Sequence, residues 1–300
     1  MQTNLNIIVT GSTSGIGLAT VKNLAKRTDK TFNIFVTSRK LANAEAAIVK
    51  LAEELPDTNS TFTALELDLG NKESVDAFVE GLVANGTKID VLVNNAGINN
   101  FDKAKESKEG FLLQWNVNYA HTRHLIEQVL EKDLIQKQGK IINISSENGT
   151  FVQFQQINPV LDAQLKDVDS FDLAKLAELE QVCISDHETP EGQAKWPRWV
   201  YNSTKVLLNI FSIILGKDPR VVERDIQVFT MCPGWCRTKL TSVMSETAPR
   251  SSDEGSQTIL YLIDLKPGID LAIQGKFFKR EKLSSYFEGI QYDNVDDVDN

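Results

Sequence analysis

The amino-acid sequence predicts an α/β protein in which a doubly wound parallel sheet carries helices on both faces. Short apolar segments rich in β-branched and aromatic residues alternate with segments of helical periodicity as far as residue 145. The short segments are continuous apolar runs instead of strict alternations of apolar and polar residues. Strands have this pattern when helices cover both faces of their sheet. A length of 300 residues suits one large domain of this class.

Each expected element follows from its local pattern. Runs of β-branched and apolar residues predict strands, and apolar residues three to four positions apart predict helices. Either Asp68 or Asn71 could cap the third helix, and the acidic first turn of the last helix suits a helix N-terminus. The expected strands are 6–10, 31–37, 62–67, 89–93, 140–144, 226–231 and 276–279, and the expected helices are 16–27, 41–55, 72–84, 201–215 and 252–263.

The regular alternation stops in the segment 150–197. Residues 163–181 are polar and acidic, with a helical pattern in their second half and no strand pattern. We therefore expect an insertion of one or two helices that packs over the edge of the sheet. The domain is expected to span residues 1–290. Residues 291–300 form an acidic tail that we expect to be disordered, because it is rich in aspartate and poor in apolar residues.

The composition argues against several classes of partner. A formal net charge of −9 disfavours general binding to nucleic acid or to anionic membranes, because phosphates would be repelled. No apolar run approaches the ~20 residues of a membrane span, and the N-terminus lacks the layout of a signal peptide. The three cysteines, Cys183, Cys232 and Cys236, form neither a disulfide framework nor a zinc-binding spacing. We therefore expect a cytoplasmic protein without a metal site.

A glycine-rich turn lies between the first expected strand and the first expected helix. Residues 10–17 read TGSTSGIG, with the glycine spacing G-x-x-x-G-x-G. Glycine lets the backbone approach a pyrophosphate closely, and a helix N-terminus supplies free N–H groups and a positive dipole end. A purely structural turn is the alternative. The placement between a first strand and a first helix favours a dinucleotide site in a Rossmann-type fold.

The end of the second expected strand distinguishes the two nicotinamide cofactors. Sites for NADH place an acid there to bind the ribose 2′-hydroxyl. This sequence has Ser38, Arg39 and Lys40 instead, and a basic pair attracts the 2′-phosphate of NADPH. NADPH is therefore favoured, although a solvated basic pair at a helix start is a common alternative. Asp68 is a candidate for the adenine amino group or for a helix cap, and the small residues of NNAG at 94–97 suit close approach of a ligand.

A tyrosine and a lysine four positions apart lie at the start of the expected helix 201–215. Tyr201 and Lys205 project from one helix face, so the ammonium is expected to lower the pKa of the phenol. Such a phenol exchanges protons near neutral pH, where general acid–base catalysis is most useful. Ser145 and Ser146 end the fifth expected strand, and a hydroxyl there could bind the same substrate oxygen. Without these companions, the tyrosine–lysine spacing is that of an ordinary amphipathic helix.

Taken in order, these motifs resemble the short-chain dehydrogenase/reductase superfamily. The matching segments are TGSTSGIG at 10–17, Asp68, NNAG at 94–97, NVNYA with Asn118, Ser146, YNSTK at 201–205 and PGWCRT at 233–238. The resemblance implies that Tyr201 is the general acid and that Lys205 holds the nicotinamide ribose and tunes the phenol. It also implies that Ser146 orients the substrate carbonyl and that Asn118 supports a proton relay. The implied cofactor contacts are Gly11, Ser12, Thr13, Ser14, Gly15, Ile16, Gly17, Arg39, Lys40, Asp68, Leu69, Asn94, Ala96, Gly97, Tyr201, Lys205, Pro233, Gly234 and Thr238.

One departure narrows the resemblance. Most members of the superfamily have a short interval between the serine and the tyrosine, whereas the insertion lengthens it here. The insertion, Trp196-Pro197 before Tyr201, and the segment CPGWCRT resemble the carbonyl reductase branch with its menthone- and salutaridine-reductase-like relatives. This resemblance implies a monomeric, NADPH-dependent reductase of ketones, aldehydes or quinones, in which the insertion covers the surface that other members use to oligomerise. Ser14 stands where animal carbonyl reductases tend to have a basic residue, so Arg39 and Lys40 are the main expected ligands of the 2′-phosphate.

Two alternative functions use the same residues. An alcohol or steroid dehydrogenase working in the oxidative direction would need the same site. A sensor protein could keep the fold and bind NADP(H) without turnover, although the complete set of Asn118, Ser146, Tyr201 and Lys205 argues against it. The expected partner is a small-molecule carbonyl substrate, with neither nucleic acid nor membrane.

Overall fold

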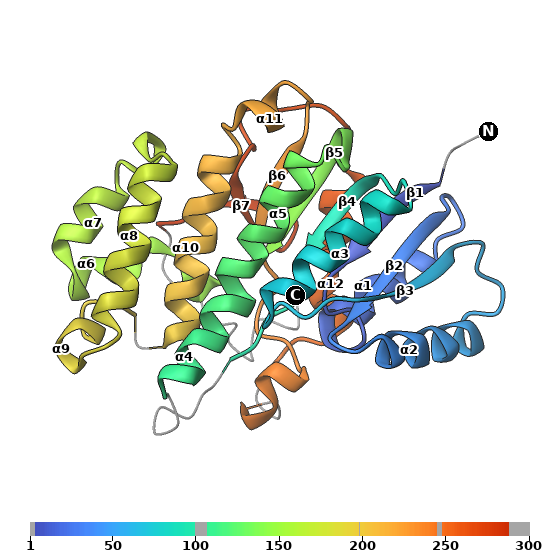
Figure 1. Ribbon diagram of the computed structural model, residues 1–300, viewed down its shortest axis with the longest axis horizontal. Coiled ribbons are helices and arrows are strands. Elements are labelled where there is room, and N and C mark those ends of the chain that lie inside the picture. The colour runs from blue at the N-terminus through green and yellow to red at the C-terminus, as the bar shows by residue number, and fades with distance from the viewer. Residues whose placement is uncertain (1–3, 100–106, 198, 245–247, 288–300) are drawn as a thin grey trace.

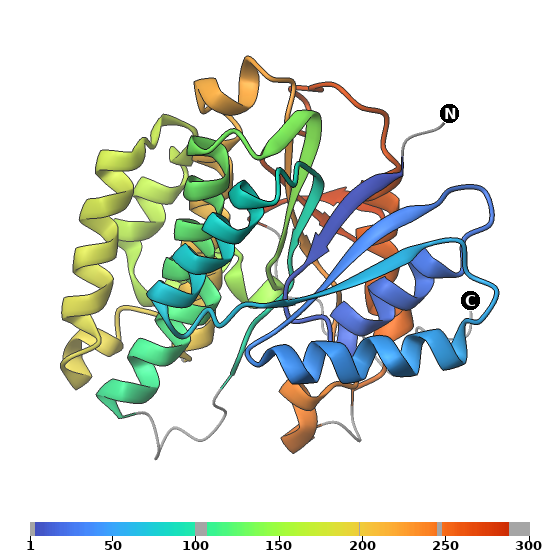
Figure 2. The same ribbon diagram turned by 45° about the vertical axis from the view of Figure 1, so that its right-hand side comes forward.

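A computed structural model of the chain describes residues 4–99, 107–197, 199–244 and 248–287. The acidic tail expected at 291–300 lies outside these residues. The described residues form one sheet with helices packed on both of its faces (Figures 1 and 2). The predicted α/β class is therefore confirmed. Among the described helices, none is long and apolar enough to cross a membrane.

The strands lie in the order β3-β2-β1-β4-β5-β6-β7-β8. All neighbours pair in parallel except β7 and β8, which are antiparallel. The chain moves outward from β1 to β3 on one side and then crosses to β4 on the other side of β1. Ligands bind sheets of this kind at the carboxyl ends of the strands, where the order reverses. The strands are β1 Leu5–Val9, β2 Phe32–Ser38, β3 Thr61–Glu66, β4 Ile89–Asn94, β5 Ile135–Ile144, β6 Gln227–Cys232, β7 Lys276–Lys279 and β8 Lys282–Ser284.

Two helical layers cover the sheet, each over its own apolar core. Helices α1, α2 and α12 pack on one face, and α3, α4, α5 and α10 pack on the other (Figures 1 and 2). Their bounds are α1 Gly15–Ala25, α2 Leu41–Glu54, α3 Lys72–Ala84, α4 Lys108–Trp115, α5 His121–Glu131, α10 Val200–Leu215 and α12 Ser252–Asp264, with the short helix α11 at Pro219–Val222 and 3-10 turns η3 at Glu147–Gly149 and η6 at Lys239–Met244.

The insertion contains more helices than the sequence predicts, and it packs elsewhere. It comprises η4 Phe151–Gln153, α6 Phe154–Ile157, α7 Pro159–Leu165, η5 Val168–Ser170, α8 Leu173–Asp186 and α9 Pro190–Gln193. The expected position over the sheet's edge is wrong, because α8 packs against α10 in the helical layer (Figure 1). Helix α10 is buried at every position from 202 to 215. A helix that is buried on all sides must be covered on all sides, and the insertion covers the side of α10 that faces away from the sheet.

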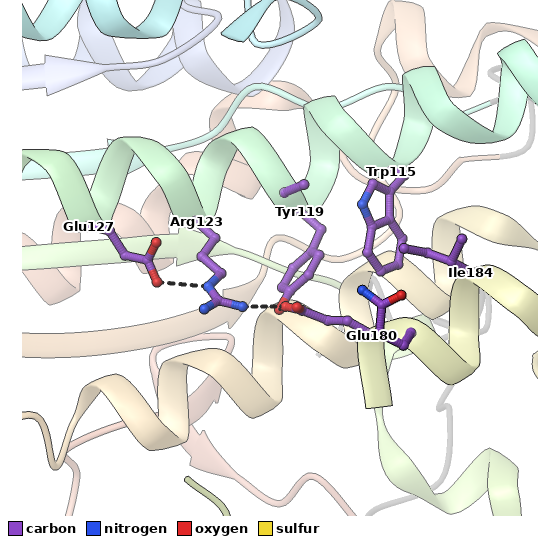
Figure 3. Close-up of a pocket in the computed structure, with 8 residues that line it drawn as sticks. Trp115, Tyr119, Arg123, Glu127, Glu180 and Ile184 are labelled. Carbon is purple, nitrogen blue, oxygen red and sulfur yellow. Dashed lines mark hydrogen bonds and ion pairs between the residues drawn. The ribbon is translucent and has the colours of Figure 1, made fainter. Parts of the chain in front are cut away.

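Charged groups fasten the insertion to the helical layer. The Tyr119 hydroxyl and the Arg123 guanidinium both donate to the Glu180 carboxylate on α8, and Arg123 Nε donates to Glu127 at 2.8 Å (Figure 3). The Arg123 guanidinium also lies 5.5 Å from the ring centroid of Phe211 on α10. Tyr119, Arg123, Glu127 and Glu180 border a cavity of about 260 Å³ between α5 and α8. The insertion is thus held by directional contacts as well as by apolar packing.

Two strands differ from the sequence expectations for local reasons. Strand β5 begins at Ile135 instead of the expected residue 140. The sequence does not indicate this earlier start, because the intervening QKQ segment has no apolar pattern. Within it, Gln138 adopts a φ of 64°, which interrupts the regular strand. Strand β8 was not predicted. Its turn from β7 consists of Arg280 and Glu281 at φ values of 50° and 57°. The usual sequence signal for such a turn is Asn-Gly or Asp-Gly, which is absent here.

Candidate active site

The sequence-predicted residues gather at the carboxyl ends of the central strands. The glycine-rich turn follows β1, and the NNAG segment follows β4. Ser146 follows β5, Pro233 follows β6, and Tyr201 lies in the first turn of α10. Because neighbouring parallel strands end at one edge of the sheet, residues far apart in sequence lie together there.

The glycine-rich turn is shaped by backbone that other residues rarely adopt. Gly11 and Gly15 have φ values of 63° and 56°, in the left-handed region that favours glycine. The Ser12 hydroxyl accepts from the Thr37 N–H at 2.9 Å, and Gly11 N–H donates to the Thr37 hydroxyl at 3.0 Å. A Cβ at Gly17 would lie 2.5 Å from the Asn95 amide nitrogen, so only glycine fits there. The turn is therefore fixed against both β2 and the NNAG segment.

The N-terminus of α1 has no side-chain cap. Ser14 is the N-cap residue, and its backbone is extended, but its hydroxyl makes no capping hydrogen bond. The first-turn N–H groups, which begin at Gly15 and Ile16, therefore keep the capacity to bind an anion such as a pyrophosphate. A Cβ at Gly15 would lie 3.4 Å from the Thr238 methyl, which places Thr238 beside the turn. Thr13 lies in the same turn and is partly exposed.

Arg39 and Lys40 are both exposed immediately after β2. An acid that sequence spacing did not indicate lies close to them. Ser38 on β2 pairs with Glu66 on β3, and the Glu66 carboxylate accepts from the Leu41 N–H at 2.9 Å. The exposed Arg39 and Lys40 side chains fit a 2′-phosphate. The Glu66 carboxylate is already engaged by the first N–H of α2, that of Leu41.

Asp68 forms a local turn and does not cap the third helix. Its carboxylate accepts from the Gly70 N–H at 2.8 Å, and the cap of α3 is Asn71, which accepts from the Glu73 N–H at 2.9 Å. Asp68 thus remains partly exposed at the carboxyl end of β3. The neighbouring Leu69 side chain is buried in the core, so its backbone is the part that could reach a ligand.

The NNAG segment connects the glycine turn to the sheet. The Thr10 hydroxyl accepts from the N–H groups of Asn95 and Ala96, each at 2.9 Å. Asn94 donates to the Asn143 side chain at 2.8 Å across β4 and β5. Ala96 packs on Gly11, where a Cβ would come within 3.0 Å. The segment therefore holds the glycine-rich turn in place.

Asn118 lies in a π-helical turn, Asn116–Ala120, between α4 and α5. Its amide accepts from the Ile98 N–H and donates to the Ile98 carbonyl, both at 2.8 Å. A Cβ at Gly97 would lie 3.3 Å from the Asn118 carbonyl oxygen and 3.8 Å from Lys205 Nζ. The wider turn thus brings Asn118 to the strand end and close to the lysine of α10.

Tyr201, Ser146 and Lys205 meet as the sequence predicts. The Ser146 hydroxyl lies close enough to the Tyr201 hydroxyl to lower the pKa of the phenol. Ser146 Oγ also accepts from the Asn148 N–H at 3.1 Å. Lys205 is buried, with Nζ 5.5 Å from the Tyr201 ring centroid and 2.7 Å from the Ile144 carbonyl that accepts its hydrogen bond. Two neighbouring hydroxyls of this kind can both reach one substrate oxygen.

The predicted lowering of the Tyr201 pKa is wrong. Burial raises the pKa of the phenol above its ordinary value, the neighbouring Cys232 thiol raises it further, and the Ser146 hydrogen bond lowers it. Burial also lowers the pKa of Lys205 to about 8. The loss of hydration outweighs the attraction of an ammonium whose hydrogen bond is directed at a backbone carbonyl.

A family model for short chain dehydrogenases matches residues 5–158, which is more than half of the chain. The chain belongs to the short-chain dehydrogenase family. The carbonyl reductase [NADPH] 1 of Mus musculus is 27% identical over 291 residues, which cover 93% of this chain and 97% of that protein. The protein of the same name from Homo sapiens is 27% identical over 286 residues, with coverage of 93% and 97%.

Solved structures of similar proteins have the same fold. Salutaridine reductase from Papaver somniferum is 21% identical, with a TM-score of 0.70 over 92% of this chain and 99% of that one. The NADPH-bound carbonyl reductase from chicken fatty liver is 21% identical, with a TM-score of 0.64 over 94% and 100%. These likenesses confirm the predicted Rossmann-type fold. Together with the family model, they confirm the predicted resemblance to the carbonyl reductase branch and the oxidoreductase class.

In this short-chain dehydrogenase, the sequence reasoning missed one thiol beside the site. Cys232 ends β6, and its Sγ accepts from the Gly234 N–H at 3.3 Å. Gly234 has a φ of 79°, which directs the chain after Pro233 across the end of the strand. Burial raises the pKa of Cys232 to about 11, so the thiol is neutral near pH 7. Among the described residues, no cluster of three or more His, Cys, Asp or Glu side chains could hold a metal ion.

Proposed function

We propose that this protein is an NADPH-dependent reductase that transfers hydride to the carbonyl of a ketone, an aldehyde or a quinone, with Tyr201 as the general acid. The observation that carries the proposal is the pair of neighbouring hydroxyls of Tyr201 and Ser146 at the carboxyl edge of the sheet, with Lys205 one helical turn from Tyr201. Such a pair can bind the oxygen of a carbonyl group and protonate it.

The cofactor is NADPH/NADP+, as in the carbonyl reductases named above. Positive φ at Gly11 and Gly15 lets the backbone approach a pyrophosphate, which the uncapped start of α1 can bind. Arg39 and Lys40 are exposed where the 2′-phosphate of NADPH would lie. When bound, NADPH supplies the hydride for the reduction.

The protein's own groups orient the carbonyl and move the proton. Tyr201 carries its proton at neutral pH, because burial holds its pKa above the ordinary value, and this is the form that a general acid needs. Ser146 accepts from a backbone N–H, so its hydroxyl hydrogen stays available to donate to the carbonyl oxygen. Lys205 carries a positive charge below about pH 8 and thereby favours negative charge developing on that oxygen. Asn118 is hydrogen-bonded to Ile98, and we assign to it the support of the proton relay.

The test is an absorbance assay of NADPH oxidation with menadione, aromatic aldehydes and ketones. Tyr201→Phe is expected to lower kcat by about a thousandfold, because the proton donor is removed while the ring stays. Its affinity for NADPH should stay close to that of the unaltered protein. Tyr261→Phe is the matched control, since Tyr261 is 39% exposed on α12. Full turnover by Tyr201→Phe would contradict the proposed role.

The same assay separates the alternatives. Faster oxidation of alcohols with NADP+ than reduction of any carbonyl would indicate a dehydrogenase working in the oxidative direction. Tight NADPH binding without turnover on the whole panel would indicate a sensor protein.

The proposal includes a monomer in the cytoplasm that acts on a small molecule. Helix α8 covers the outer side of α10, and a covered helix is not free to pair with a second copy. The cysteines Cys183, Cys232 and Cys236 are free and buried, as suits a reducing compartment. Sedimentation of the purified protein would reveal a dimer if the monomer assignment is wrong.

A further inference from the structure

A half-buried ion pair lies next to Ser146. Glu147, the following residue, contacts the Lys279 ammonium, and the two side chains are 15% and 12% exposed. No other ion pair between described residues is as buried on both sides. Desolvation of two charges offsets most of their attraction, so a pair of this kind adds little net stability. The contact between the two side chains can, however, fix the position of the backbone to which they belong.

The sheet holds Lys279 in place. This residue ends β7 and pairs in register with Cys232 at the end of β6. Cys232 in turn lies close to both Tyr201 and Lys205. The ammonium therefore extends from a rigid strand end close to the catalytic groups, and it contacts the first residue of η3.

Helix α10 holds the other end of the same turn. A Cβ at Gly149 would lie 2.8 Å from the Lys205 backbone, so η3 rests directly on α10. Asn209 also donates to the Gly149 carbonyl at 2.9 Å. Ser146 accepts from the Asn148 N–H inside this turn. The position of the Ser146 hydroxyl thus depends on where η3 is held at Glu147 and at Gly149.

The segment after β8 fastens the continuation of this loop. The Phe151 N–H donates to the Tyr286 carbonyl at 2.6 Å, and the two rings stack with centroids 5.1 Å apart. The Tyr286 hydroxyl donates to the Gly275 carbonyl at 2.9 Å. Residues that follow the last parallel strand therefore hold the chain on the far side of η3. On the near side, the Ser145 N–H donates to the Met231 carbonyl at 2.8 Å, and the Glu147 side chain holds the first residue of η3.

We propose that Glu147 and Lys279 are positioning residues for the reaction: their ion pair fixes the turn that aims the Ser146 hydroxyl at the substrate oxygen. The inference rests on the proposed function, because it assigns these residues to a role that acts through Ser146. It predicts that the pair matters for turnover and much less for cofactor binding.

The experiment measures kcat, the KM for NADPH and the midpoint of thermal unfolding for Lys279→Met and Glu147→Gln. Both variants should lower kcat by about tenfold, because small displacements of a catalytic group are costly, while the KM for NADPH stays unchanged. The charge-reversed double variant Glu147→Lys with Lys279→Glu should recover most of the lost turnover. Lys30→Met is the matched control, since it removes a more exposed ion pair with Asp264 before β2, at the opposite edge of the sheet.

Ser146→Ala separates this inference from the proposed function. If Ser146→Ala keeps full turnover, the serine has no catalytic role, and both proposals fail. If it loses turnover while Lys279→Met and Glu147→Gln keep theirs, the positioning role alone is wrong. In the Ser146→Ala background, Lys279→Met should have no further effect on the residual turnover, because its action passes through the missing hydroxyl. An undiminished tenfold loss in that background would also overturn the inference.

Discussion

The two buried lysines near strand β5 show how differently the two faces of the sheet use the same group. Lys140 lies on β5 itself, on the α12 face, and its ammonium donates to the carbonyls of Leu262, Ile263 and Leu265 at the end of α12. Lys205 approaches β5 from the α10 face, and among the described residues it donates to one carbonyl, that of Ile144. Burial lowers the pKa of both lysines to about 8.

Because Lys140 and Lys205 have the same lowered pKa, burial alone does not show which of the two lysines takes part in catalysis. The number of satisfied N–H groups does distinguish the two lysines. An ammonium has three donors, and Lys140 uses all three to complete the C-terminus of a helix. Lys205 has donors left to face the Tyr201 side of the site. On the α12 face, Lys140 thus completes the end of a helix, whereas the proposed function gives Lys205 on the α10 face a role in the reaction.

The largest expected effect tests the lysine on the α10 face. Lys205→Met should lower kcat by about a hundredfold or more, because the charge that favours a negative substrate oxygen is lost. The thermal unfolding midpoint should change little, since one hydrogen bond is removed. Steady-state kinetics with NADPH and menadione provide the measurement. If Lys140→Met lowered kcat as strongly, the division of roles between the two lysines would be wrong.

The second expected effect concerns stability. Lys140→Met should lower the free energy of unfolding by about 2–3 kcal/mol, because the carbonyls at the end of α12 lose a charged donor. Unfolding in urea, followed by circular dichroism, provides the measurement, and kcat should stay close to that of the unaltered protein. An unchanged midpoint in urea would show that the helix end does not need this lysine.

The smallest expected effect is a pH dependence. Because the pKa of Lys205 is lowered to about 8, its ammonium is present below that pH and is lost as the pH rises through it. Reduction should therefore be constant below pH 8 and should fall by about tenfold for each further pH unit. Lys205→Arg keeps its charge and should abolish this fall. A fall that persists in the arginine variant would assign the titration to another group.

The sequence predicted the parts of the site that depend on local spacing. TGSTSGIG after the first strand, and the four-residue interval from Tyr201 to Lys205, each fix a backbone shape or a helix face by themselves. The parallel sheet with helices on both faces also followed from the alternation of strands and helices. Most strand boundaries agree to within a residue or two, since they depend on the same apolar runs.

The missed features depend on long-range contacts or on burial. Asn95 binds the Thr10 backbone, and Glu66 reaches the start of α2, but no spacing in the sequence signals either contact. The raised pKa of Tyr201 could not be predicted, because helix spacing gives the distance to an ammonium and not the loss of water. The insertion was misplaced because a polar, acidic segment does not reveal which apolar surface it covers.

The π-helical turn at Asn116–Ala120 holds one residue more than a regular helical turn, and it joins α4 to α5 without a break. Deleting one residue here would leave a regular α-helical turn, so α5 would keep its register and Arg123 would still face Glu180 on the insertion. The Asn118 side chain, which lies inside the wide turn, would lose its place beside Ile98. A single missing codon at this place would thus alter the site and spare the anchorage of the insertion.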